Sequence, residues 1–285
     1  MHSTVLPVYL ITGFLGSGKT TLLRRFAETQ PRRRMVFLVN ELAGQDVDAG
    51  RLQDAGSPTL SVVGGSIFCE CRAADFLRML REDVLPAHDR NPLDALVIET
   101  SGIADPGAIG TLIKASGHGD ILQVRRIITV LAPSSFRRLF GNLPVVEAQL
   151  RAADVVMLNK CDLADPETIA DCRAAVRKVN PGAQQVETAF CRDLPSLETL
   201  RAAPLPEGAF GKCGDLRYQG EILSPPDFAD PAAFRDWCGA AWRVKGVARI
   251  GGTLREVDLT PEHFQCRPVE RGAVSLVRIQ SKPEP

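Results

Sequence analysis

The sequence predicts an α/β fold, in which a doubly wound, mostly parallel sheet is followed by a small C-terminal α+β domain. Through the first two thirds of the 285 residues, apolar runs alternate with amphipathic segments. The apolar runs are mostly continuous, which is typical of parallel strands covered by helices on both faces. We expect strands at 8–12, 34–40, 59–63, 95–100, 125–131, 154–159 and 184–189, and helices at 18–29, 73–85, 106–115, 144–151 and 166–179.

The composition changes near residue 203. A stretch with Pro204, Pro206 and Gly208 interrupts the alternation and is typical of a domain boundary. We therefore expect one domain over 1–202, a linker over 203–215 and a small domain over 216–285. For the small domain the pattern predicts a helix at 231–241 and strands at 216–222, 244–250, 254–258 and 274–279.

Charge and hydropathy exclude several classes of protein. The 34 basic residues balance the 34 acidic ones, so nothing points to nucleic acid or to an anionic membrane. No apolar run is long enough to span a bilayer. The first predicted strand begins by residue 8, so we expect no cleavable signal, a cytoplasmic location and eight reduced cysteines.

The segment from Gly13 to Thr21 carries the strongest signal in the chain. It has the spacing G-x-x-x-x-G-K-[ST] and lies between a predicted strand and a predicted helix. This pattern indicates a P-loop that binds a nucleoside triphosphate, and it predicts that the parallel sheet is that of a P-loop NTPase. Lys19 is expected to reach the β- and γ-phosphates, and the Thr20 hydroxyl to bind Mg²⁺. The expected nucleotide-binding residues here are Gly13, Gly16, Ser17, Gly18, Lys19, Thr20 and Thr21.

A second motif indicates which base is bound. Asn159-Lys160-Cys161-Asp162 follows the apolar run 154–158. The Asp162 carboxylate can accept hydrogen bonds from N1 and the 2-amino group of guanine, a donor pair that adenine lacks. Asn159 can support the loop, and Lys160 can lay its aliphatic stem on the purine ring. We therefore expect GTP and GDP as ligands.

A third motif lies at the end of the predicted strand 95–100. Glu99 is placed to complete the Mg²⁺ shell, directly or through water. Gly102 follows three residues later and can offer its backbone N–H to the γ-phosphate, because no Cβ blocks the approach.

Together the segments GFLGSGKTT, VNELAGQDVDA, ETSGIADP and NKCD resemble the CobW-type branch of the SIMIBI-class GTPases, relatives of the hydrogenase nickel-insertion GTPases. The resemblance covers about residues 5–200 and continues faintly at Trp242–Gly246. It implies a GTP-hydrolysing metallochaperone or insertase that handles Zn, Co, Ni or Fe. It also implies a client metalloenzyme or cofactor-assembly protein as a partner. The sequence leaves open whether the protein forms a homodimer.

The resemblance further implies a metal site, from which this chain departs. The family pattern Gly-Cys-Ile-Cys-Cys corresponds here to Gly65-Ser66-Ile67-Phe68-Cys69, so only the last cysteine is present, and Cys71 is an added thiol. A Cys-x-Cys pair of thiolates favours Zn²⁺, Co²⁺ or another thiophilic ion. A third ligand is needed, and the resemblance places Glu41 near the metal and the γ-phosphate; water, a partner protein or a second subunit are the alternatives.

Three functions remain open at this point. The first is a GTPase metallochaperone with Lys19, Thr20, Glu41, Glu99 and Gly102 as its catalytic set. The second is a nucleotide-gated adaptor or maturation factor that binds no metal itself, which the missing cysteines favour. The third, a P-loop phosphotransferase, is disfavoured by the guanine motif. No arginine finger is identifiable, so we expect slow intrinsic turnover that a dimer partner or client could accelerate.

The P-loop assignment predicts that Lys19→Ala abolishes GTP turnover, a loss of at least about 100-fold, because the ammonium group stabilises charge on the transferred phosphoryl group. Phosphate release at saturating Mg²⁺ and GTP is the measurement. Wild-type turnover in the variant would contradict the assignment.

Overall fold

The computed structural model describes residues 4–41, 59–63, 66–196, 204–211 and 218–281. These residues form two compact units. The first contains the described residues up to 211, and the second contains residues 218–281.

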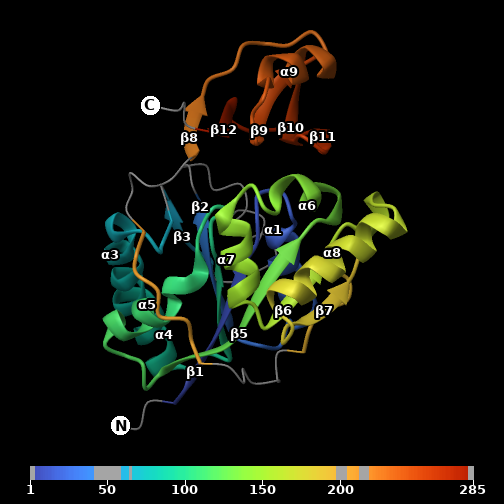
Figure 1. Ribbon diagram of the computed structural model, residues 1–285. Coiled ribbons are helices and arrows are strands. Elements are labelled where there is room, and N and C mark those ends of the chain that lie inside the picture. The colour runs from blue at the N-terminus through green and yellow to red at the C-terminus, as the bar shows by residue number, and fades with distance from the viewer. Residues whose placement is uncertain (1–3, 42–58, 64–65, 197–203, 212–217, 282–285) are drawn as a thin grey trace. The chain divides into compact units, whose positions relative to one another are not determined.

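The first unit is built on a seven-stranded sheet in which every pair of neighbouring strands is parallel. The strand order is β3-β2-β4-β1-β5-β6-β7 (Figure 1). The strands are β1 Leu6–Thr12, β2 Met35–Glu41, β3 Thr59–Val63, β4 Ala95–Glu99, β5 Leu122–Leu131, β6 Val155–Leu158 and β7 Gln184–Glu187. The expected α/β class and parallel sheet are confirmed, and all seven expected strands are present with small shifts of their ends.

Helices connect these strands. They are α1 Lys19–Thr29, α3 Glu70–Met79, α4 Leu85–Arg90, α5 Ile109–Ser116, α6 Pro133–Leu139, α7 Pro144–Ala152 and α8 Pro166–Val179. A π-helical turn, Leu80–Val84, joins α3 to α4, and a 3₁₀ turn, Pro106–Ala108, precedes α5. The carboxyl group of Asp105 accepts a hydrogen bond from the Gly107 backbone N–H over 2.8 Å and so caps this turn.

Two apolar clusters hold the sheet between its helix layers. One face packs against α3, α4 and α5, where Phe76, Leu85 and Leu112 are buried (Figure 1). The other face packs against α1 through Leu22, Leu23 and Phe26. Because β1 and β4 are buried on both faces, their residues are apolar without alternation, as the sequence suggested.

Residues 204–211, expected to belong to a linker, run along the surface of the first unit as a strap. At one end, the Gly110 N–H donates to the Pro206 carbonyl over 3.0 Å and the Gly208 N–H donates to the Gly107 carbonyl over 2.7 Å. At the other end, the Gly211 N–H donates to the Phe68 carbonyl over 2.8 Å. Leu205 and Phe210 pack against the apolar cluster beneath. The strap is therefore part of the first unit.

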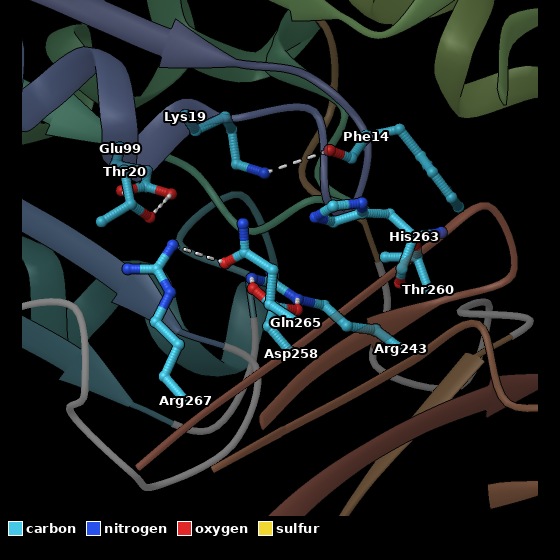
Figure 2. A network of polar contacts seen from close by, with 10 residues as sticks. All are labelled: Phe14, Lys19, Thr20, Glu99, Arg243, Asp258, Thr260, His263, Gln265 and Arg267. Carbon is cyan, nitrogen blue, oxygen red and sulfur yellow. Dashed lines mark hydrogen bonds and ion pairs between the residues drawn. The ribbon is translucent and has the colours of Figure 1, made fainter. Parts of the chain in front are cut away.

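The second unit is a five-stranded antiparallel sheet with one helix, α9 Pro231–Cys238. Its strand order is β11-β10-β9-β12-β8, with β8 Tyr218–Leu223, β9 Arg243–Ile250, β10 Thr253–Thr260, β11 His263–Pro268 and β12 Ser275–Ser281. Arg243 donates two hydrogen bonds to Asp258 over 3.1 and 3.0 Å, which ties β9 to β10 (Figure 2). Neither β11 nor α6 of the first unit was expected from the sequence.

Aromatic rings form the core of the second unit. The buried Phe234 contacts Phe228 edge to face at a centroid distance of 5.2 Å and stacks on Phe264 at 5.6 Å. Such pairs stabilise a core beyond the area that they bury.

Phe234→Ala is expected to lower the free energy of unfolding by about 3–5 kcal/mol, because it removes a fully buried ring from a small core and leaves a cavity. Denaturant unfolding followed by tryptophan fluorescence measures the change, since Trp237 packs against the same cluster. Ile222→Ala, at an exposed position of the same sheet, is the matched control and should change stability by about 0.5 kcal/mol or less. Equal effects of the two substitutions would contradict this account of the core.

Candidate functional site

The loop Gly13–Gly18 joins the end of β1 to the start of α1. Gly18 caps α1 and has a φ of 111°, a left-handed conformation that favours glycine. A Cβ at Gly18 would lie 2.3 Å from Nδ2 of Asn159. This nitrogen donates a hydrogen bond to the Ser17 carbonyl oxygen over 2.9 Å. The P-loop therefore lies directly against the predicted base loop, which starts at Asn159.

Lys19, Thr20 and Glu99 meet at the start of α1 and the end of β4 (Figure 2). The Lys19 side chain is buried, and its Nζ donates to the Phe14 carbonyl oxygen over 3.3 Å. The Thr20 hydroxyl donates to both carboxylate oxygens of Glu99 over 3.3 and 3.4 Å, and Glu99 is only 6% exposed. A hydroxyl facing a buried carboxylate beside a P-loop offers the oxygen ligands that Mg²⁺ prefers.

Three hydroxyl groups support a bound ligand at this place. Among the described residues, the side-chain oxygens of Thr12, Ser17 and Ser101 are buried without a hydrogen-bond partner. A buried hydroxyl that lacks a partner costs about 1–3 kcal/mol. Ser17 belongs to the P-loop, and Ser101 lies between Glu99 and Gly102. The residues of the site thus fit a nucleoside triphosphate with its Mg²⁺, whose oxygens would supply the missing partners.

The Ser101 loop, residues 100–105, lies against the P-loop. A Cβ at Gly102 would lie 2.8 Å from the backbone nitrogen of Leu15, so only glycine allows this approach. From α7, the buried Gln149 side chain donates to the carbonyl oxygens of Gly102 and Ala104 over 3.3 and 3.0 Å. The sequence analysis missed Gln149, whose signal is a polar residue on the apolar face of a helix.

The base loop, residues 159–162, presents its acid to solvent. Lys160 has a φ of 62°, and a short 3₁₀ turn, Cys161–Leu163, follows it. The backbone N–H of Cys161 donates to the Thr188 carbonyl oxygen over 3.2 Å. Asp162 is exposed in this turn, so its carboxylate is open to a base edge.

A further loop, residues 188–193, borders the base loop. The Asn159 side-chain oxygen accepts a hydrogen bond from the Cys191 N–H over 3.1 Å, while the Thr188 hydroxyl donates to the Asp193 carboxylate over 2.8 Å. Phe190 and Cys191 have φ angles of 56° and 51°, a left-handed backbone that is uncommon for such residues. The Phe190 side chain is 52% exposed. Cys191 was not expected in the site.

The structure describes the candidate metal residues only in part. Cys69 caps α3 and is 3% exposed. Glu41 ends β2 and Cys71 lies in α3, but the side chains of both lie outside the described residues. Among the residues that are described, no three His, Cys, Asp or Glu side chains form a group that could hold a metal ion.

Two other cysteines of the first unit, Cys172 and Cys191, are fully buried. Burial raises the pKa of the Cys191 thiol to about 12, and the same cause raises the pKa of the Cys172 thiol to about 12. The Cys191 thiol also donates a weak hydrogen bond to the Gly18 carbonyl oxygen, 3.7 Å away. Both thiols therefore stay protonated at neutral pH and act as small apolar groups.

We expect iodoacetamide at pH 8 to leave Cys191 and Cys172 unmodified in the native protein, because only the thiolate reacts and both pKa values lie far above this pH. Peptide mass spectrometry measures the modification of each cysteine. The partly exposed Cys266 is the internal control and should react. Modification of Cys191 at the rate of Cys266 would show that the loop 188–193 opens in solution.

Comparison with known proteins agrees with this geometry. Residues 7–187 match the family model of the CobW/HypB/UreG nucleotide-binding domain. The zinc chaperone CobW of Pseudomonas aeruginosa is 31% identical over 221 residues, which cover 67% of this chain and 58% of that protein. Zinc-regulated GTPase metalloprotein activator 1 of Schizosaccharomyces pombe is 29% identical over 201 residues, which cover 65% of this chain and 46% of that protein.

The chain thus spans about half the length of the curated relatives it matches. The crystal structure of the Zn(II)-bound YjiA GTPase from E. coli aligns at a TM-score of 0.49 and 19% identity, over 98% of this chain and 95% of that one. Within the described residues, no helix has the length and apolar character needed to cross a bilayer. The sequence motifs, the P-loop geometry and the family match lead to one conclusion: the chain belongs to the CobW/HypB/UreG family, and residues 7–187 are its nucleotide-binding domain.

Proposed function

We propose that this protein is a Mg²⁺-dependent GTPase that carries a thiophilic divalent metal ion and delivers it to a client protein. The observation that carries the GTPase part is the Thr20 hydroxyl facing the buried Glu99 carboxylate beside a P-loop lysine. The metal-carrying part is supported by the names of the relatives, which include a zinc chaperone and a zinc-regulated GTPase metalloprotein activator.

Hydrolysis would rest on positioning and charge stabilisation. Lys19 would exchange its hydrogen bond to Phe14 for one to the phosphates, which keeps a buried ammonium group paired throughout. Thr20 and Glu99 would hold Mg²⁺, which neutralises phosphate charge when bound. The Gly102 backbone N–H, held close to the P-loop, would donate to the γ-phosphate.

Base selection would fall to the base loop. The exposed Asp162 carboxylate would accept hydrogen bonds from the two guanine donors, and the Lys160 stem would cover the ring. Asn159 would not contact the base itself but would position the base loop, because its side chain forms hydrogen bonds with the P-loop and with Cys191 at the same time.

The cargo would be Zn²⁺ or Co²⁺, held by the thiolates of Cys69 and Cys71 with a carboxylate oxygen from Glu41. Thiolate ligands favour these ions over Mg²⁺. Three ligands leave one tetrahedral position open, which suits an ion that must be passed on to a client.

One observation favours the second function, a nucleotide-gated adaptor without a metal site. Ser66 and Phe68 occupy the places of two family cysteines, and both side chains are buried. Phe68 packs into the apolar cluster under the sheet, and the Ser66 side-chain oxygen accepts a hydrogen bond from the Phe68 N–H over 3.2 Å. These two positions serve local packing in this chain.

Metal titration of the reduced protein, with a non-hydrolysable GTP analogue or GDP bound, separates the two functions. A carrier is expected to bind Zn²⁺ or Co²⁺ in a nucleotide-dependent way, and Cys69→Ser/Cys71→Ser should weaken binding by at least about tenfold because both thiolates are lost. Cys266→Ser is the matched control and should bind like wild type. Equal, weak binding by wild type and the double variant would contradict the carrier and support the adaptor.

A further inference from the structure

One buried amide joins two loops that the proposed function treats separately. Asn40 lies one residue before the end of β2 and is 3% exposed. Its side-chain oxygen accepts a hydrogen bond from the Ile67 N–H over 3.0 Å and another from the Ser101 N–H over 3.3 Å. A single oxygen atom therefore positions the backbone of both loops.

The first of these loops belongs to the nucleotide site. Ser101 lies between Glu99 and Gly102, and its own hydroxyl is buried without a partner among the described residues. Its N–H can make one strong hydrogen bond at a time. A phosphate or water oxygen that attracts this N–H would take it from Asn40.

The second loop leads to Cys69. Ile67 lies two residues before Cys69, whose N–H donates to the Ser66 carbonyl oxygen over 2.9 Å. The N–H groups of Arg72 and Ala73, in the first turn of α3, both donate to the Cys69 carbonyl oxygen over 2.9 Å. The segment 66–69, which we call the Cys69 segment, is therefore a tight turn fixed to α3, and a displacement of Ile67 moves Cys69 with it.

The backbone of Asn40 itself is held in place. β2 pairs with β4 on one side and with β3 on the other, and the partner of Asn40 in β3 is Val62. Strand pairing therefore holds the Asn40 backbone, while its side-chain oxygen holds the two loops. The two loops thus share one side-chain oxygen as a hydrogen-bond acceptor.

We infer that Asn40 is a positioning residue that transmits the state of the nucleotide from the Ser101 loop to the Cys69 segment. This inference rests on the proposed function and deepens it, because it names the residue through which GTP and GDP set the metal site differently. Asn40 touches neither nucleotide nor metal in this scheme and acts through the backbone N–H groups of Ile67 and Ser101.

Amide hydrogen exchange tests the link without any metal. In wild type, a peptide over 66–76 should exchange at rates that differ by about fivefold or more between the GTP-analogue and GDP states, the low end of ordinary coupling between sites. In Asn40→Ala the difference should fall below about twofold. Asn40→Leu, which keeps the branching of asparagine at Cγ but offers no hydrogen-bond acceptor, provides a second variant if the alanine variant does not fold.

Ser66→Ala is the matched control. It removes a buried side-chain oxygen that bonds within the Cys69 segment, to the Phe68 N–H, and leaves the Asn40 bonds in place. The state-dependent difference should persist in this variant. A peptide over α8 serves as the internal reference in every sample and should not respond to the Asn40 substitutions.

Three results would overturn the inference. These are a wild-type peptide that exchanges equally in both states, a difference that persists in Asn40→Ala and Asn40→Leu, or a loss of the difference in Ser66→Ala as well.

Metal titration of the same proteins distinguishes failure of the proposed metal carrier from failure of the proposed role of Asn40. If wild type binds metal in a nucleotide-dependent way and the Asn40 variants do so too, the proposed function stands and the role of Asn40 fails. If wild type binds no metal but exchange still couples the loops, the metal carrier fails and the role of Asn40 stands.

Discussion

The site depends on the hydrogen bonds of three buried side-chain amides. Asn159 bonds to the P-loop and to Cys191, Asn40 bonds to the Ser101 loop and to Ile67, and Gln149 bonds to two carbonyl oxygens of the Ser101 loop. Loops that bind phosphate cannot satisfy their own backbone groups as a helix or strand does, and each buried group left unpaired costs about 1–3 kcal/mol. The amides supply these partners without adding charge next to a polyanion.

Two charged side chains, Lys19 and Glu99, are buried in the same site as these neutral amides. Burying a charge is costly unless it is paired. The Lys19 ammonium group donates a hydrogen bond to the Phe14 carbonyl oxygen over 3.3 Å, and the Glu99 carboxylate accepts from the Thr20 hydroxyl over 3.3 and 3.4 Å. Phosphate oxygens are charged acceptors for the Lys19 ammonium group, and Mg²⁺ is a charged partner for the Glu99 carboxylate. Binding of nucleotide and Mg²⁺ would therefore bring an opposite charge to each of these two side chains, and hydrolysis would change the number of phosphate oxygens near Lys19.

Each of the two units has its own apolar core. The first buries apolar residues on both faces of a parallel sheet, while the second relies on a cluster of aromatic rings under one small antiparallel sheet. The strap 204–211 belongs to the first by its hydrogen bonds, at one end to the helix region after the Ser101 loop and at the other to Phe68. The strap thus forms hydrogen bonds close in sequence to each of the two loops that Asn40 joins.

The sequence by itself determined the parts of the site that are local. The P-loop, the acid at the end of β4 and the base loop each lie within a few residues, and their spacing after buried strands places them at one edge of a parallel sheet. Short elements were missed because their stability comes from packing and pairing: α6 buries Phe136 and Leu139, and β11 exists through its pairing with β10. Only the tertiary structure decided which side chains join the loops. Asn40 and Ser101 are 61 residues apart, Gln149 and Gly102 are 47 apart, and Asn159 and Cys191 are 32 apart. No local pattern encodes these contacts, because an amide finds its partner only after the strands have set the loops side by side.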